Sequence, residues 1–426
     1  MRWINSVACC QLVLFGLTGT VDGQQWDRFR GPNGSGVSEA TTIPVRWSDT
    51  DYNWITLLPG RGHSSPVIWG KRIFVTSADP AADQRYLLCI DSNDGSVLWK
   101  KTYPLHTFKR NKRNSFASHT PAVDAKHVYT IWQSSSNSRL VALDHDGGQV
   151  WEYPLGDYTG GHGPGISPIV HDDLVIICND QEKGENSFLV ALDVASGTPR
   201  WKIDRPSDRA CYSTPCVYQQ PGQPATIIFT HSYRGISGVD AASGSMLWEI
   251  DVFGTHNQRA IGSPVVDGDL VIGSSGFTTG IKNVVAVRPR REAENGTVKE
   301  IYRIASSVPH IPSPLVHNGL LFLWSDIGVV SCFDAKTGKL HWHGRVGGNY
   351  QGSPICVGGR LYCIDQDGVV VVVNATAKGL KILARNELGE ASSATPAVIG
   401  GRMYLRTQSQ LFSIGGSVVG GRESRK

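Results

Sequence analysis

Cationic and imidazole side chains gather just before many of the Ser-Pro and Thr-Pro dipeptides that recur along the chain. Proline has no N–H to give to a β-ladder, so each of these prolines fits the first position of a strand. If such strands line one channel, the residues before them meet at its mouth, where positive charge favours an anionic ligand or an acidic partner segment. Solvated loop charge is the alternative, and the sequence leaves it open. The candidate ligand-binding residues at this channel mouth are Arg61, His63, Arg113, His162, Arg209 and Arg259, with His310 and Tyr350 before two later strands.

The remaining motifs predict neither a catalytic nor a metal-binding residue. The chain has no GxSxG elbow, HExxH pair, Walker lysine loop or kinase HRD and DFG sequences. His341 and His343 would share one face of a strand, but an exposed outer strand also carries polar residues at alternate positions, and we favour that interpretation. The glycines of residues 31–36 lack a following Lys-Ser/Thr, so we interpret this stretch as a surface loop. We expect the glycine-rich stretch around His162, residues 160–165, to be flexible.

The cysteines show no zinc-site spacing of the CxxC…CxxC kind. Cys89 and Cys332 stand at a position that holds Ala or Gly in other copies of the repeat described below, which indicates small packing residues. Cys211 and Cys216 are near enough in the chain to approach one another, and the sequence leaves their redox state open.

An internal repeat must position these residues. Each copy begins at one of the prolines, continues through an apolar strand and a turn rich in Gly or Asp, and then enters a second apolar strand. Asp-Gly and Gly-Gly turns suit tight hairpins because they accept positive φ. The 48 Gly and 22 Pro of the 426 residues agree with many short strands joined by tight turns. The opening prolines are Pro66, Pro121, Pro168, Pro215, Pro264, Pro314, Pro354 and Pro396.

The second half of each repeat adds two more strands. A small residue, an Asp, a Gly and a Trp recur in that order, as in Cys332, Asp334, Gly338 and Trp342. Asp can cap the turn, Gly can take its left-handed position, and Trp is large enough to fill the space between neighbouring blades. Looser copies have Gly148 in the second repeat, Tyr302 in the Trp position of the fifth and Leu383 in that of the seventh; the fifth also carries an insertion, residues 288–296.

The last repeat ends after Leu411–Ile414 without its fourth strand or its Trp. Near the other end, residues 45–47 and 53–57 form an orphan strand region that contains Trp54. Pairing this strand with the last sheet would close the ring and remove an exposed edge. The sequence therefore predicts an all-β, eight-bladed propeller with four-stranded antiparallel blades, built from residues 24–416 and closed by an N-terminal strand.

The two ends carry different signals. Residues 1–23 combine Arg2 with a short apolar stretch, which predicts a cleaved signal peptide and a periplasmic or extracellular protein with no transmembrane segment in the mature chain. Residues 417–426 are expected to form a flexible basic tail. The net charge of +4 is too dispersed for a nucleic-acid footprint, and we expect a monomer.

The segment from Cys332 to Trp342 resembles the tryptophan-docking motif of pyrroloquinoline quinone (PQQ) dehydrogenases, which also occurs in a PQQ-like propeller that helps to assemble outer-membrane β-barrels. Residues 26–36 resemble the start of exported PQQ-like propellers of unknown role. If the resemblance extends to the enzymes, it implies a channel that binds PQQ and a metal ion such as Ca2+, together with a catalytic carboxylate. Many of these enzymes also have a disulfide between adjacent cysteines. Here the adjacent cysteines, Cys9 and Cys10, lie in the expected signal, and no metal-ligand set can be placed.

The resemblance thus favours an exported, non-enzymatic binding or scaffold protein of the cell envelope. An envelope protein, a glycan or a small anionic ligand would be its partner. The alternative is a quinoprotein oxidoreductase that uses PQQ and Ca2+ on an alcohol or a sugar.

Overall fold

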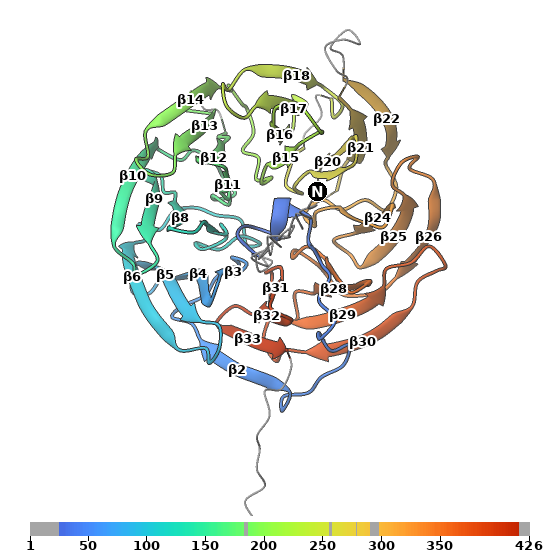
Figure 1. Ribbon diagram of the computed structural model, residues 1–426, viewed down its shortest axis with the longest axis horizontal. Coiled ribbons are helices and arrows are strands. Elements are labelled where there is room, and N and C mark those ends of the chain that lie inside the picture. Colours follow the sequence, from blue (N-terminus) through green and yellow to red (C-terminus); the bar gives the residue numbers. More distant parts are fainter. Residues whose placement is uncertain (1–24, 183–185, 255–257, 278, 290–297, 417–426) are drawn as a thin grey trace, which may run out of the picture.

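Eight β-sheets stand radially around one axis in the computed structural model, which describes residues 25–182, 186–254, 258–277, 279–289 and 298–416 (Figure 1). The predicted all-β, eight-bladed propeller is confirmed. A short 3-10 helix, η1 (Pro32–Gly34), is the one helical element of the described residues, so none of them forms a helix able to span a membrane. The expected signal peptide, basic tail and most of the 288–296 insertion lie outside the described residues.

In the first four blades, the strands are named here in order from the innermost to the outermost. Blade 1 contains β3 (Val67–Trp69), β4 (Arg72–Asp79), β5 (Gln84–Asp91) and β6 (Val97–Pro104). Blade 2 contains β7 (Ala122–Val123), β8 (His127–Trp132), β9 (Ser138–Asp144) and β10 (Gln149–Gly156). Blade 3 contains β11 (Ile169–His171), β12 (Leu174–Asn179), β13 (Phe188–Asp193) and β14 (Pro199–Asp204). Blade 4 contains β15 (Cys216–Tyr218), β16 (Thr226–His231), β17 (Gly235–Asp240) and β18 (Met246–Ile250).

The other four blades follow the same order. Blade 5 contains β19 (Val265–Asp267), β20 (Leu270–Gly276), β21 (Lys282–Arg288) and β22 (Lys299–Ile304). Blade 6 contains β23 (Leu315–His317), β24 (Leu320–Trp324), β25 (Val329–Asp334) and β26 (Leu340–Arg345). Blade 7 contains β27 (Ile355–Val357), β28 (Arg360–Ile364), β29 (Val369–Asn374) and β30 (Ile382–Glu387). Blade 8 contains β31 (Ala397–Ile399), β32 (Arg402–Arg406), β33 (Gln410–Gly415) and β2 (Tyr52–Leu57).

Small residues and tryptophans face each other across the two outer strands of a blade. Gly238 pairs with Trp248, and a Cβ on Gly238 would lie 2.3 Å from the indole. Cys89 opposite Trp99 and Cys332 opposite Trp342 occupy the same place and are fully buried. The interpretation of these cysteines as packing residues is therefore supported by their surroundings.

Each of these aromatic rings also docks on the turn of the next blade. The Trp99 indole of blade 1 donates a 2.8 Å hydrogen bond to the His145 carbonyl of blade 2, and Tyr302 makes the equivalent 2.7 Å bond to Ala335. The turn glycine adopts positive φ and leaves room for the ring: a Cβ on Gly197 would lie 2.6 Å from Trp151. The hydrophobic core accordingly lies in clusters between neighbouring blades rather than at the axis.

The N-terminal strand closes the ring as predicted. Strand β2 pairs antiparallel with β33, with Trp54 opposite Ser413 and Leu57 opposite Gln410 (Figure 1). The Trp54 indole donates to the Ser92 carbonyl of blade 1, and its ring covers Gly95. Trp54 thus supplies blade 8 with the inter-blade contact that the C-terminal sequence lacks.

Three details of the predicted repeat were wrong: one expected strand and two expected positions in the outer strands or turns. Residues 45–47 form no strand. The left-handed turn glycine of blade 2 is Gly147, not Gly148, because it is Gly147 that packs under Trp99. In blade 7 the residue opposite Val372 is Ala384 rather than Leu383, because a longer turn moves the outer strand by one position.

The glycine-rich segment before β2 is not the surface loop that we expected. It enters the channel, where the backbone of Trp26 pairs with Ile68 of blade 1 and β1 (Val37–Ser38) adds a parallel strand to β27 of blade 7. Figure 1 shows this blue segment at the centre of the ring before it runs outward to β2. We call residues 26–38 the plug.

The plug bridges distant blades through its polar groups. Asn33 exchanges two hydrogen bonds of 2.8 and 2.7 Å with Val217 of blade 4, and the Asp27 carbonyl accepts one from Val123 of blade 2. The guanidinium of Arg28 donates to the Pro215 carbonyl of blade 4, and that of Arg30 to the Pro354 carbonyl of blade 7. Trp26 and the two arginines are buried, so the plug closes one end of the channel as a packed element.

Ring closure predicts a test of stability. Replacing the buried Trp54 with Ala should lower the free energy of unfolding by about 3–5 kcal/mol, because the indole and its inter-blade hydrogen bond are lost. The control is Leu57→Ala on the same strand, where the side chain is 75% exposed and the loss should stay within about 0.5 kcal/mol. Urea unfolding monitored by far-UV circular dichroism, rather than by tryptophan fluorescence, measures the free energy of unfolding of both variants. Equal losses in the two variants would contradict closure through Trp54.

Candidate ligand-binding site in the central channel

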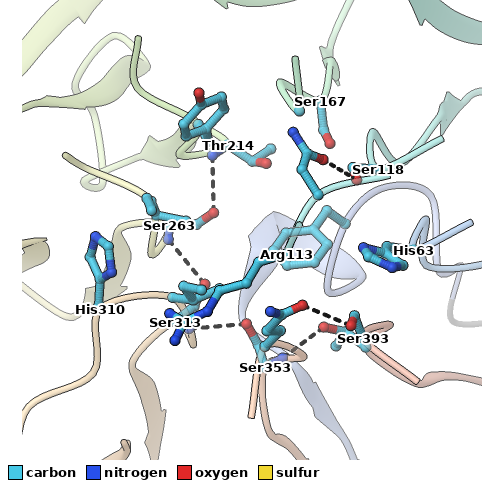
Figure 2. Close-up of a pocket in the computed structure, with 18 of the residues that line it drawn as sticks. His63, Arg113, Ser118, Ser167, Thr214, Ser263, His310, Ser313, Ser353 and Ser393 are labelled. Atoms are coloured by element: carbon cyan, nitrogen blue, oxygen red, sulfur yellow. Dashed lines mark hydrogen bonds between the residues drawn. The ribbon is translucent and has the colours of Figure 1, made fainter. Parts of the chain in front are cut away.

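A cavity of about 470 Å3 occupies the channel at the end opposite the plug's strand β1 (Figure 2). All eight loops that connect the outer strand of one blade to the inner strand of the next contribute to its lining. Phe29 of the plug also lines the cavity. The convergence of the inter-blade loops on one mouth is as predicted, whereas the contribution of the plug was not foreseen.

A ring of hydroxyl groups surrounds the cavity. Each blade supplies the Ser or Thr that precedes its opening proline, and the backbone N–H of one blade donates to the hydroxyl oxygen of the next (Figure 2). Seven such hydrogen bonds of 2.9–3.1 Å are formed; the eighth, from Ser167 to Thr214, is not formed although both residues are described. The hydroxyl ring consists of Ser65, Thr120, Ser167, Thr214, Ser263, Ser313, Ser353 and Thr395.

Positive groups dominate the charged part of the lining. Lys112, Arg113 and Arg259 line the cavity, and none of the described lining residues is a carboxylate. Within the described chain, the side chains of Lys112 and Arg113 have no ion-pair partner. Figure 2 shows Arg113 extending across the cavity towards Ser313. The site therefore presents unneutralised positive charge to any molecule that enters it.

Arg259 is the one cation of the lining that is paired. Its guanidinium donates to Glu182, which lies behind the cavity wall, and approaches Nδ1 of His162 at 3.2 Å. Burial opposes ionisation of Glu182, but the hydrogen bonds from the Gly161 N–H and from Arg259 outweigh it, so the pKa of Glu182 lies below its ordinary value. Glu182 is thus a fixed anion that orients Arg259.

Hydrogen bonds from neighbouring side chains reach the backbone of the loop that carries His162. The Asn114 amide donates 2.9 Å hydrogen bonds to the carbonyls of His162 and Pro164, and the Tyr158 hydroxyl donates to the Gly163 carbonyl. Neighbouring side chains thus satisfy the carbonyls of this loop, and its expected flexibility stays a prediction. The hydrogen bonds from Asn114 also connect this loop to the one that carries Lys112 and Arg113, since Asn114 follows them directly.

The imidazoles of the cavity are neutral near pH 7. Burial and the nearby guanidinium of Arg406 lower the pKa of His63 to about 4. Burial also lowers the pKa of His310 to about 4 and, together with Arg259, lowers the pKa of His162. At neutral pH the positive charge of the site therefore comes from Lys112 and the arginines.

The structure brings four of the six predicted site residues together. His63, Arg113, His162 and Arg259 line the cavity. Arg61 is exposed and reaches Gln408 outside the cavity, and Arg209 lies on the far side of Glu182, 4.0 Å from its carboxylate. Binding of a ligand by any of the six stays a prediction.

Of the two further residues that we expected near the channel mouth, one lines the cavity and the other does not. His310 lines the cavity. Tyr350 is buried against Trp324 with ring centroids 5.2 Å apart, so it is a packing residue.

Sequence reasoning missed the hydroxyl ring, Lys112 and Phe29. The signal for the ring was present, because every opening proline follows a Ser or a Thr. We interpreted this Ser or Thr only as a sign that a strand begins, and not as a residue whose side chain faces the channel. Phe29 carried no such signal, since nothing periodic places the plug inside the ring.

A buried polar cluster lies between blades 3 and 4, near the cavity wall. One ligand atom each of Asp180, Cys211 and His231 lies within 4.8 Å of the others, as a metal site would require. Arg205, however, donates to both carboxylate oxygens of Asp180, at 3.0 and 2.6 Å. Both nitrogens of His231 are also engaged, with the Tyr233 N–H and Ser207. Hydrogen bonds already engage the candidate ligand atoms, so we interpret the cluster as a buried ion-pair network.

The other candidates of the sequence fall outside the cavity. His341 and His343 are exposed on the outer strand β26, in agreement with the interpretation we favoured. Cys211 and Cys216 are buried free thiols; the Cys211 sulfur lies 3.0 Å from the Ser232 hydroxyl, and Cys216 is on strand β15.

The cavity does not suit a Ca2+–PQQ centre. Ca2+ takes six to eight oxygen ligands, among them carboxylates, and the described lining has none. Two acids that contact lining residues are already engaged: Glu182 pairs with Arg259, and Asp326 accepts the N–H groups of His310 and Ile311. A carboxylate able to act as a base is therefore also missing from the described lining.

These features define an eight-bladed PQQ-like β-propeller with a cavity formed by its inter-blade loops. The family model described as "Outer membrane protein assembly factor BamB" matches residues 83–310 and 283–422, so the chain belongs to this family. A curated relative from Moranella endobia (strain PCIT), named outer membrane protein assembly factor BamB, is 24% identical over 282 residues, which cover 61% of this chain and 67% of the relative.

Solved structures share the fold at low identity. BamB from Moraxella catarrhalis has a TM-score of 0.59 at 17% identity and covers 86% of this chain and 99% of its own. A europium-containing methanol dehydrogenase has a TM-score of 0.64 at 13% identity, with 91% and 90% covered. Quinohemoprotein alcohol dehydrogenase from Comamonas testosteroni has a TM-score of 0.63 at 13% identity, with 92% and 80% covered. At these identities the likeness concerns the fold alone.

The buried imidazoles predict how stability depends on pH. His63 has a pKa of about 4 in the folded protein and about 6.5 when unfolded, so the unfolded chain takes up a proton first as the pH falls. Its contribution should therefore be lost between pH 6.5 and 4, by about 1.4 kcal/mol for each pH unit, and change little below pH 4.

Urea unfolding at pH 7 and pH 5 measures this dependence. His63→Gln should make it shallower by on the order of 2 kcal/mol, whereas the exposed control His341→Gln should leave it unchanged. The same pH dependence in His63→Gln and the unsubstituted protein would contradict a neutral imidazole with a lowered pKa at this position.

Proposed function

We propose that the protein is an exported, non-enzymatic binding or scaffold propeller of the cell envelope. The observation that carries this proposal is the convergence of all eight inter-blade loops on one cavity whose described lining offers cations, imidazoles and hydroxyls but no carboxylate. Such a lining suits recognition, and it lacks both the base and the metal ligands that quinone-dependent oxidation would need. The protein would engage an envelope protein, a glycan or a small anionic ligand through the cavity and the loops at its mouth.

Membership of a family described by an outer-membrane assembly factor supports an envelope location. The relative from Moranella endobia carries the same description, which favours a partner among the proteins of the envelope. Export would rest on cleavage of residues 1–23, which intact-mass measurement of the protein recovered from the periplasm or medium would reveal. Barrel assembly is the narrower form of this proposal.

A turnover assay separates the proposal from a quinoprotein oxidoreductase. Purified protein would be incubated with PQQ and Ca2+ and then supplied with alcohols or sugars and an artificial electron-accepting dye. We expect no substrate-dependent dye reduction, since the described cavity lining holds no carboxylate. A quinoprotein alcohol dehydrogenase assayed in parallel shows that the reagents work. Saturable PQQ binding with turnover would refute the non-enzymatic proposal.

Site-specific photo-crosslinking tests which face of the ring meets a partner. A photoreactive residue in place of Lys112, which is exposed at the cavity mouth, should crosslink to an envelope component in living cells. Asn318 is the matched control, because it is also exposed but lies in the turn at the other end of strand β23. Crosslinking only from Asn318 would place the partner on the face away from the cavity and contradict the proposal.

A further inference from the structure

The hydroxyl ring offers hydrogen-bond donors to the cavity. A hydroxyl has one hydrogen to donate and two acceptor positions. In seven members of the ring one acceptor position is taken by the backbone N–H of the preceding blade. No residue in the described part of the chain accepts the hydrogens of the ring hydroxyls. These hydrogens are therefore available to a ligand.

Fixed positive charge surrounds the same space. Arg406 is fully buried behind the wall next to His63, where it donates to the carbonyl and hydroxyl of Ser64. No carboxylate pairs with it among the described residues, and its Nε and Nη2 atoms have no hydrogen-bond partner there. Its charge contributes to the lowered pKa of His63, which shows that its potential reaches a residue of the cavity lining. Lys112 and Arg113 add unpaired charge at the mouth.

Donor hydrogens and positive charge, with no carboxylate in the described lining, favour a particular ligand chemistry. A neutral sugar would form no charge-assisted hydrogen bond with Lys112 or Arg113 and would leave their charge without a counter-charge. A cation would meet no carboxylate in the described lining. Carboxylate, sulfate and phosphate groups carry only acceptor oxygens when fully ionised, and their hydrogen bonds to guanidinium and hydroxyl groups are strengthened by charge.

We propose, building on the binding function above, that the cavity holds a small organic oxyanion whose charged group contacts Arg113 and the hydroxyls of Ser313 and Ser353. Arg113 extends towards this part of the ring in Figure 2. A cavity of about 470 Å3 is within the range of small-molecule sites. Because the plug closes the other end of the channel, the ligand enters and leaves by the mouth that Lys112 and Arg113 flank.

Isothermal titration with matched sugars tests the proposal. D-glucuronate, D-glucose 6-sulfate and D-glucose 6-phosphate share the ring of neutral D-glucose and distinguish the three oxyanions from one another. At least one of them should bind saturably with a Kd about tenfold or more below that of D-glucose at pH 7.5, since a charge-assisted hydrogen bond is worth at least such a factor. Failure of all three to bind up to about 20 mM, or equal binding of D-glucose, would overturn it.

Substitutions locate the site. Arg113→Gln should weaken the anionic ligand about tenfold, whereas Arg61→Gln, which removes an exposed arginine outside the cavity, should leave the Kd unchanged. Ser353→Ala should weaken binding and Ser353→Thr should retain it, because threonine keeps both the donor and the acceptor of the Ser313 N–H. If Ser353→Ala does not fold, the Arg113 and threonine variants carry the test. Equal weakening by Arg61→Gln and Arg113→Gln would refute the location.

The two proposals can fail separately. Oxyanion binding together with dye reduction would refute the non-enzymatic function and keep the ligand class. Absence of both would refute the ligand class and keep the non-enzymatic function.

Discussion

Around the inner circumference, the hydroxyl that precedes an opening proline ties seven of the eight pairs of neighbouring blades; the pair joined at Ser167 and Thr214 is the exception in the described structure. The residue before a proline is restricted to extended backbone, which holds its N–H towards the neighbouring blade. The resulting bonds, such as Ser263 to Ser313 and onward to Ser353, run around the axis and pass from blade 8 to blade 1 where Thr395 donates to Ser65. The same hydroxyls form the cavity wall, so one chemical group both joins the blades and faces the cavity. Loss of one hydroxyl would therefore change the contact between two blades and the cavity lining together.

The outer circumference depends on a different contact. Tryptophans dock on turn glycines of the following blade, and Trp54 continues this pattern across the point where the two ends of the chain meet. Arg28, Arg30 and Arg406 are buried with orphaned guanidinium atoms in the described structure, and burial lowers their pKa values to about 10, 9 and 9. Burying a charge without a counter-charge is costly, so the hydrogen bonds that these guanidinium groups donate to backbone carbonyls offset part of that cost.

The repeat made the fold readable from the sequence because its signals are local. Proline, the Asp-Gly turn and the Trp recur within one blade, so their meaning does not depend on distant residues. The same logic placed His63, Arg113, His162 and Arg259 at one mouth. It could not separate them from Arg61, because a shift of two residues along an inter-blade loop turns a side chain from the cavity to solvent.

The plug marks the limit of that reasoning. Its contacts join Trp26 to Ile68, Asn33 to Val217 and Arg30 to Pro354, and none of these pairs is related by the repeat. A non-repetitive segment carries no periodic signal, and its glycines fit a surface loop equally well. Only the three-dimensional arrangement reveals that Phe29 lines the site.

The place of β2 in blade 8 has a consequence for how the molecule folds. The contact between Trp54 and Ser413 spans almost the whole described chain, so it cannot form until the last strand is available. Contacts of such sequence separation carry a large loop-closure entropy and form slowly. Until that strand pairs with them, residues 52–57 form an unpaired edge that is open to wrong pairing. We therefore expect the ring to be completed late in the folding of a newly made chain.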